Sequence, residues 1–112
     1  MSTDPKEQAL DLLHTARAEL AKAILHLPSS GGDERDRLGQ KQERVDAAIR
    51  GLVDASFAGA EGEAGLKEAI DALSARTEEI AGIEKTIDTV DSVVDVASQI
   101  LDAAAAVAGF VA

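Results

Sequence analysis

Three residues near the N-terminus, Glu7, Asp11 and His14, have types and a spacing that could bind a metal ion. Residues three and four apart lie on the same face of a helix, and a carboxylate with a histidine three residues later is used in helical di-metal sites. Such sites need matching carboxylates from several helices, and these residues lie away from the leucines of their segment. We therefore interpret them as a polar stripe that faces water. The sequence predicts no metal site and no cofactor.

A second group of acidic residues near the C-terminus follows steps of four, three, four and seven. This acidic stripe consists of Glu84, Asp88, Asp91, Asp95 and Asp102. A calcium loop gathers its oxygen ligands on a tight turn, which a straight line along a helix does not provide. Two interpretations stay open: the stripe is the solvent line of a mostly buried helix, or it docks on the basic face of the 33–57 segment, in its own chain or in a neighbour.

The rest of the sequence contains no motif with recognisable chemistry. There is no cysteine, which excludes disulfides and thiolate sites. There is also no nucleophile elbow, no phosphate-binding loop and no zinc-binding helix motif. We expect that the protein is not an enzyme and that it has no catalytic or cofactor-binding residues. The net charge of −10 repels nucleic acid, so we expect no nucleic-acid partner either.

The apolar residues predict an all-α helical bundle that forms a single domain over residues 1–112. Aromatic residues make up only 2% of the chain, so the core must come from Leu, Ile, Val and Ala, which suits helices that approach closely. Apolar residues recur at steps of three and four. We expect two shorter antiparallel helices near 5–27 and 33–57 and one long, coiled-coil-like helix near 63–110.

The long C-terminal segment is the element around which the others must be arranged. It contains no proline, and its apolar pattern slips by one three-residue step near Gly82. We prefer a continuous helix. In the alternative, Gly82 ends one helix and Thr86 caps the next, which gives a four-helix bundle.

A continuous helix leaves an apolar stripe that the shorter helices cannot cover. Such a stripe indicates an interface. We therefore expect a helical protein–protein interaction module that forms a homo-oligomer or binds another helical protein. The residues predicted to form the interface are Ile87, Val90, Val94, Ala97, Leu101, Ala104 and Ala108.

The competing function is a membrane-active or export-linked protein that uses Val93–Ala112. This segment contains Asp95 and Asp102, and an aspartate near the bilayer centre costs about 2.5–3.5 kcal/mol. We therefore expect no permanent membrane span. The first residues lack a basic region followed by an apolar core, so we expect no signal peptide and a cytoplasmic location. Export by a leaderless route stays open.

Overall fold

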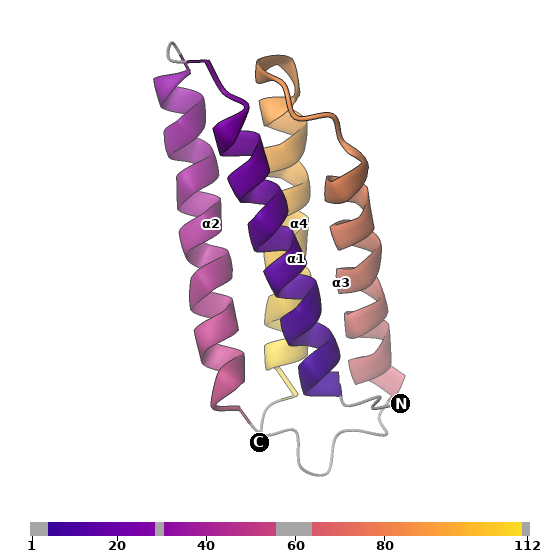
Figure 1. Cartoon of the computed structure of the whole chain (residues 1–112). Helices are drawn as coiled ribbons and strands as arrows, with labels where there is room; N and C mark the ends of the chain where they lie inside the picture. The colour runs from indigo at the N-terminus through magenta and orange to yellow at the C-terminus, as the bar shows by residue number, and fades with distance from the viewer. Residues whose placement is uncertain (1–4, 29–30, 56–63, 111–112) are drawn as a thin grey trace.

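The computed structural model describes residues 5–28, 31–55 and 64–110, and all regular structure in these ranges is helical. The helices run alternately up and down the bundle (Figure 1). The expectation of an all-α helical bundle is confirmed. The elements are α1 (Pro5–Leu25), α2 (Gly32–Val53), α3 (Ala64–Gly82), the short 3₁₀ helix η1 (Ile87–Thr89) and α4 (Val90–Ala108).

The four helices occupy the corners of a square in the order α1, α2, α4, α3. Each helix packs on its two neighbours, and α1 also touches α4 across one diagonal, while α2 and α3 lie on the other. Alanines seven residues apart on α1 and on α4 are buried and let this diagonal pair approach closely: Ala9, Ala16, Ala23, Ala97 and Ala104. Because the helices alternate in direction, this order around the square makes α2 and α4 parallel neighbours (Figure 1).

The first two helices are slightly shorter than the sequence predicts. α1 ends at Leu25, two residues early, because Pro28 disfavours helical backbone at the residue before it. α2 ends at Val53, where Asp54 closes the last turn by donating its N–H to the carbonyl of Leu52. The predicted end of this helix at Phe57 and the predicted start of the next at Glu63 lie outside the described residues.

The continuous helix predicted for 63–110 is wrong. α3 ends at Gly82, and the chain folds back so that α4 lies antiparallel to α3 (Figure 1). The four-helix alternative is the observed one. At the far end of this hairpin the ring of Phe110 packs over Gly65, so closely that a Cβ at Gly65 would lie 2.9 Å from it.

Burial explains why the chain turns although no proline stops the helix. A continuous helix gives up no backbone hydrogen bonds, and each bond contributes about 0.5–1.5 kcal/mol net. The fold-back buries four large side chains of α4 that the rod would leave partly uncovered: Val93, Val96, Ile100 and Val107. Burying each contributes about 1.5–3 kcal/mol, so burial exceeds the cost of the few bonds lost at the turn.

A single lysine closes the turn between α3 and α4. Lys85 donates from Nζ to the carbonyl oxygen of Ile80, in the last turn of α3, at 2.5 Å and to that of Ile83, the first residue after α3, at 2.7 Å. A cation there also complements the helix dipole. The same ammonium lies 3.3 Å from Oε1 of Glu19 on α1. The side chains of Lys85 and Glu19 are only 7% and 8% exposed, so the two charges neutralise each other inside the bundle.

Two threonines start the next helix. Thr86 has extended backbone, with φ −130° and ψ 170°, and forms a capping box with Thr89. The N–H of Thr86 donates to Oγ1 of Thr89 at 3.0 Å, and this hydroxyl donates to the carbonyl of Glu84 at 2.6 Å. The cap therefore ties both sides of the turn together.

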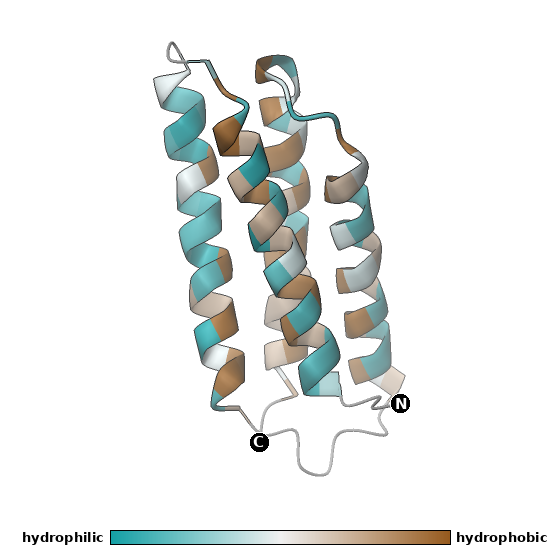
Figure 2. Ribbon diagram, in the orientation of Figure 1, coloured by the Kyte–Doolittle hydropathy of each residue, from teal (hydrophilic) through white to brown (hydrophobic). Residues whose placement is uncertain are grey.

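The core is a column of aliphatic side chains, as the low aromatic content predicts. Figure 2 shows hydrophilic residues along the outward sides of the helices. Each helix contributes large side chains that are almost fully buried: Leu13, Leu20, Leu38, Val45, Leu66, Leu73, Ile80, Val93, Ile100 and Val107. Thr77 is also buried, and its hydroxyl donates to the carbonyl of Leu73 at 2.7 Å.

We predict that Leu20→Ala and Leu73→Ala each lower the free energy of unfolding by about 2–5 kcal/mol, because both side chains are fully buried. Asp11→Ala, at an exposed position of α1, should change it by less than about 0.5 kcal/mol. Urea unfolding followed by circular dichroism measures all three. A larger loss at Asp11 than at Leu20 would contradict the assignment of the faces of α1.

We predict that Lys85→Met lowers the free energy of unfolding by about 3 kcal/mol, because it leaves Glu19 inside the bundle without its buried cation. The matched control is Lys22→Met. Lys22 also pairs with Glu19, at 3.2 Å, but its side chain is 64% exposed, so its loss should cost less than about 1 kcal/mol.

Replacing both partners, in Glu19→Gln/Lys85→Met, removes the isolated buried charge. This double variant should therefore recover part of the stability that Lys85→Met loses. Equal effects of Lys85→Met and Lys22→Met would show that the buried contact does not hold the turn.

Candidate interaction surface

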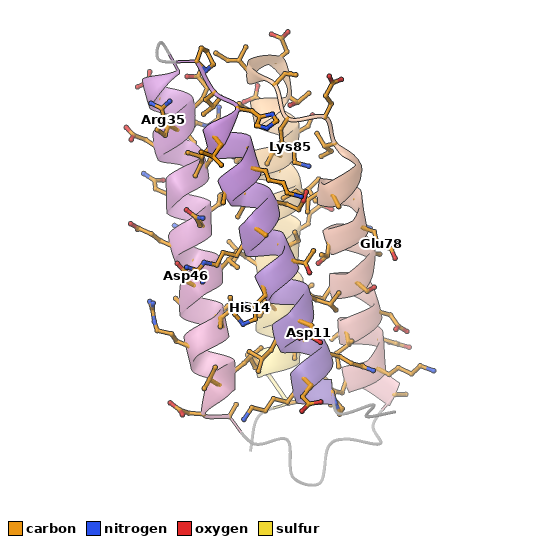
Figure 3. The ribbon with its side chains drawn as sticks, in the orientation of Figure 1. Asp11, His14, Arg35, Asp46, Glu78 and Lys85 are labelled. Carbon is orange, nitrogen blue, oxygen red and sulfur yellow. The ribbon has the colours of Figure 1, made fainter. Side chains whose placement is uncertain are left out.

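The polar stripe of α1 lies on the surface. Glu7, Asp11 and His14 are all exposed, and Figure 3 shows Asp11 and His14 at the front of α1. Asp11 lines a shallow hollow of about 360 Å³ between α1 and α3, together with Asp71. No group of three or more His, Cys, Asp or Glu side chains that could hold a metal occurs in the described part of the chain.

The acidic stripe is divided by the fold-back and does not run down one helix. Glu84 lies in the turn, Asp88 in η1, and Asp91, Asp95 and Asp102 lie on α4. All five residues are exposed. The three on α4 point away from the core, since the buried residues of this helix occupy its opposite side.

The predicted interface residues divide into two sets. Val90, Ala97 and Ala104 are buried within the single chain. They were expected to be uncovered, and this part of the expectation is wrong because the fold-back places α4 against the other helices. The remaining four stay accessible in whole or in part: Val94 and Leu101 are half-buried, and Ile87 and Ala108 are exposed.

Ala105 and Ala108 of α4 meet small residues of α2 in a groove. This groove has a volume of about 360 Å³ and is lined by Ala48, Gly51, Leu52, Ala104, Ala105 and Ala108. Val94 and Leu101 continue the same side of α4 upward, seven residues apart, and Leu101 lies seven residues before Ala108. We call the outer surface of these two helices, including this groove, the α2/α4 face.

Basic residues of α2 border the α2/α4 face. Arg37, Lys41 and Arg44 follow steps of four and three on the side of α2 that also carries Ala48. Arg37 shows that this side is turned toward α4, because its Nη1 lies 2.7 Å from Oδ1 of Asp91. Docking of the acidic stripe on the basic helix, one of the two interpretations that the sequence left open, is therefore observed within the chain at this one position.

The parallel course of α2 and α4 fixes which residues lie at the same height. Both helices rise by about 1.5 Å per residue, and Arg37 is level with Asp91. Arg44 is then level with about Ser98, between Asp95 and Asp102. Lower down, the α2/α4 face changes from charged to small and apolar, at Gly51 and Ala105. It thus has a charged upper half and an apolar lower half.

Other charged residues of α2 are used inside the chain. Asp46 binds Nε of Arg17 at 2.8 Å, and Arg35 donates to the carbonyl of Pro28 at 3.4 Å (Figure 3). The first contact joins α2 to α1, and the second joins α2 to the segment that follows α1. The basic residues that sequence reasoning placed on one outer face of α2 are therefore divided between its two sides.

Sequence reasoning did not identify the groove on α2 or the buried Glu19–Lys85 pair. The small residues Ala48 and Gly51, three apart on a helix, are a signal that could have indicated the groove. The position of Lys85 opposite Glu19 depends on the fold-back and has no local signal.

The described part of the segment considered for membrane activity, residues 93–110, belongs to the bundle, since Val93, Val96 and Val107 are buried. Within the described ranges, no helix has the length and hydrophobicity that crossing a membrane requires. Comparisons with protein-family models, curated proteins and solved structures find no match for this chain.

Proposed function

We propose that the protein is a non-enzymatic helical interaction module whose partner is a second copy of the chain, bound through the α2/α4 face. The observation that carries the proposal is the combination on this face of an accessible apolar groove with separate basic and acidic edges. A groove between Ala48, Gly51 and Ala105 accepts a closely approaching helix because its side chains are small.

Charge favours this face over the others. At a net charge of −10 two copies repel each other, so they can meet only where opposite charges compensate. The α2/α4 face offers Lys41 and Arg44 on one helix, and Asp95 and Asp102 on the outer side of the other. Complementary charges across an interface fix its register and orientation.

A two-fold axis parallel to the helices brings these charges together. It places α2 of one copy over α4 of the other without changing heights along the axis. Arg44 then lies over the partner's α4 between the levels of Asp95 and Asp102. A two-fold axis perpendicular to the helices would instead place α2 of one copy against α2 of the other. It would also bring the acidic residues of the two α4 helices near each other, which is repulsive.

The face is also large enough. The bundle measures 49 × 23 × 22 Å, and one long side can supply the roughly 800 Å² per partner that specific interfaces bury. The half-buried Val94 and Leu101 would become the apolar centre of such an interface, and the charged residues its rim.

We predict that Ala105→Arg weakens dimer formation by about tenfold or more, because it places a long charged side chain in the groove without touching the core. The matched control is Ala106→Arg. Ala106 is exposed on the same helix but does not line the groove, so this variant should dimerise like the unchanged protein. Sedimentation equilibrium measures both dissociation constants.

A monomer at about 100 μM, where a micromolar dissociation constant gives mostly dimer, would contradict the proposal. Equal weakening by Ala105→Arg and Ala106→Arg would also contradict it, because the contact would then not involve the groove.

A further inference from the structure

The turn between α3 and α4 is held by few contacts and lacks a residue that prevents helix. Residues 83–86 and the short helix η1 separate α3 from α4, and none of residues 83–86 is proline or glycine. The chain is kept out of a helix there by the contacts of Lys85 and by the Thr86–Thr89 capping box. These contacts are specific to the closed hairpin, since Thr86 has extended backbone here and a continuous helix requires helical backbone at this residue.

We infer that residues 83–86 are a hinge through which two copies of the chain exchange α4. When the hinge opens, α3 and α4 become one helix over residues 64–108, about 68 Å long. The α4 segment then leaves its own bundle and fills the same place in a second bundle, whose α4 fills the first. The two bundles lie end to end about a two-fold axis at the hinge.

The exchanged dimer keeps almost all contacts of the single chain. Val93, Val96, Ile100 and Val107 meet the same surroundings, now supplied by the partner. The energetic difference between the forms is therefore confined to the hinge and to the new contact beside it. Opening loses the Lys85 contacts and the threonine cap but gains helical hydrogen bonds across residues 83–86.

Two isoleucines provide the new contact. Ile87 is 40% exposed and Ile83 is half-buried. Four residues apart, they lie on one face of the continuous helix, in line with Ile80 and Val90. In the exchanged dimer two such helices run side by side at the two-fold axis, where each can cover the exposed isoleucines of the other. The closed chain leaves Ile87 uncovered.

This inference extends the proposed self-association, since the partner is again a second copy, but it does not use the α2/α4 face. The two contacts can therefore be separated by experiment. Ala105→Arg weakens contact through the face, so we use it as the background in which exchange is measured. A dimer in this background that Ile87→Pro blocks and Ile87→Ala retains forms by exchange.

The test is the dimer fraction of hinge variants in the Ala105→Arg background, measured by sedimentation velocity after partial unfolding in urea and refolding at high concentration. Lys85→Ala removes the hydrogen bonds to Ile80 and Ile83, and we expect it to raise the dimer-to-monomer ratio by at least about tenfold. The change Thr86→Ala/Thr89→Ala removes only the capping box and should act in the same direction, which gives a second variant if Lys85→Ala does not fold.

Proline at position 87 should block exchange. Ile87 is the first residue after the Thr86 cap, where proline is favoured, and the extended backbone of Thr86 suits the residue before a proline. Within a continuous helix the same proline clashes with the carbonyl of residue 83, at a cost of about a hundredfold in equilibrium constant for each helix. Ile87→Ala is the control, because it also lacks the isoleucine but permits the continuous helix.

We expect Ile87→Pro, combined with Lys85→Ala or with Thr86→Ala/Thr89→Ala, to abolish the refolded dimer, while Ile87→Ala in the same combinations retains it. After dilution, the retained dimer should dissociate no faster than the chain unfolds, since α4 must first leave the core of the partner's bundle. Folded hinge variants that stay monomeric after refolding would overturn the inference. So would a dimer that tolerates Ile87→Pro as well as Ile87→Ala.

Discussion

The fold depends on how the C-terminal end of α3 is satisfied inside the bundle. A helix that stops at Gly82 leaves carbonyl groups near its end without helical partners. The ammonium of Lys85 donates hydrogen bonds to the carbonyl oxygens of Ile80 and Ile83 there. A buried ammonium needs a counter-charge, and Glu19 of α1 supplies it. A buried ion pair adds little net stability but penalises arrangements that separate its members. We infer that its main effect is to select the closed hairpin.

The surface follows from this hairpin. With α4 folded back, its large apolar residues enter the core and Asp91, Asp95 and Asp102 face outward. Its neighbour α2 runs parallel to it and presents Arg37 and Arg44 beside that line. The α2/α4 face therefore has edges of opposite charge, and the proposed dimer is built on this contrast. The turn of the same hairpin contains no strong helix breaker. For this reason we infer that α4 can be exchanged between two copies of the chain.

Much of the fold could be predicted from the sequence. The steps of three and four between apolar residues predicted buried helix faces, on which Leu13, Leu20, Leu66 and Leu73 lie, and the expected end of the first helix near residue 27 is close to the observed end at Leu25. The break after Gly82 was the weaker of two predictions, because local signals at 83–86 favour neither helix nor turn. Whether the chain turns after Gly82 depends on how α4 packs against residues distant in the sequence, and no local sequence pattern indicates this packing. The candidate surface was predicted in part. The stripe through Val94 and Leu101 was found, but Val90 and Ala97 were wrongly assigned to it, because only the fold-back buries them.

The most direct test of the closed hairpin is a distance within one chain between α3 and α4. Spin labels at the exposed positions Glu68 and Ala106, in protein diluted with unlabelled chains, report it by pulsed electron resonance. Neighbouring helices lie roughly 8–10 Å apart, and Gly65 meets Phe110 at this end of the bundle. We therefore expect a distance below about 25 Å, allowing for the label linkers. In protein that has not been unfolded and refolded, a main peak near 57 Å, the length of a continuous helix between the two labels, would contradict the account.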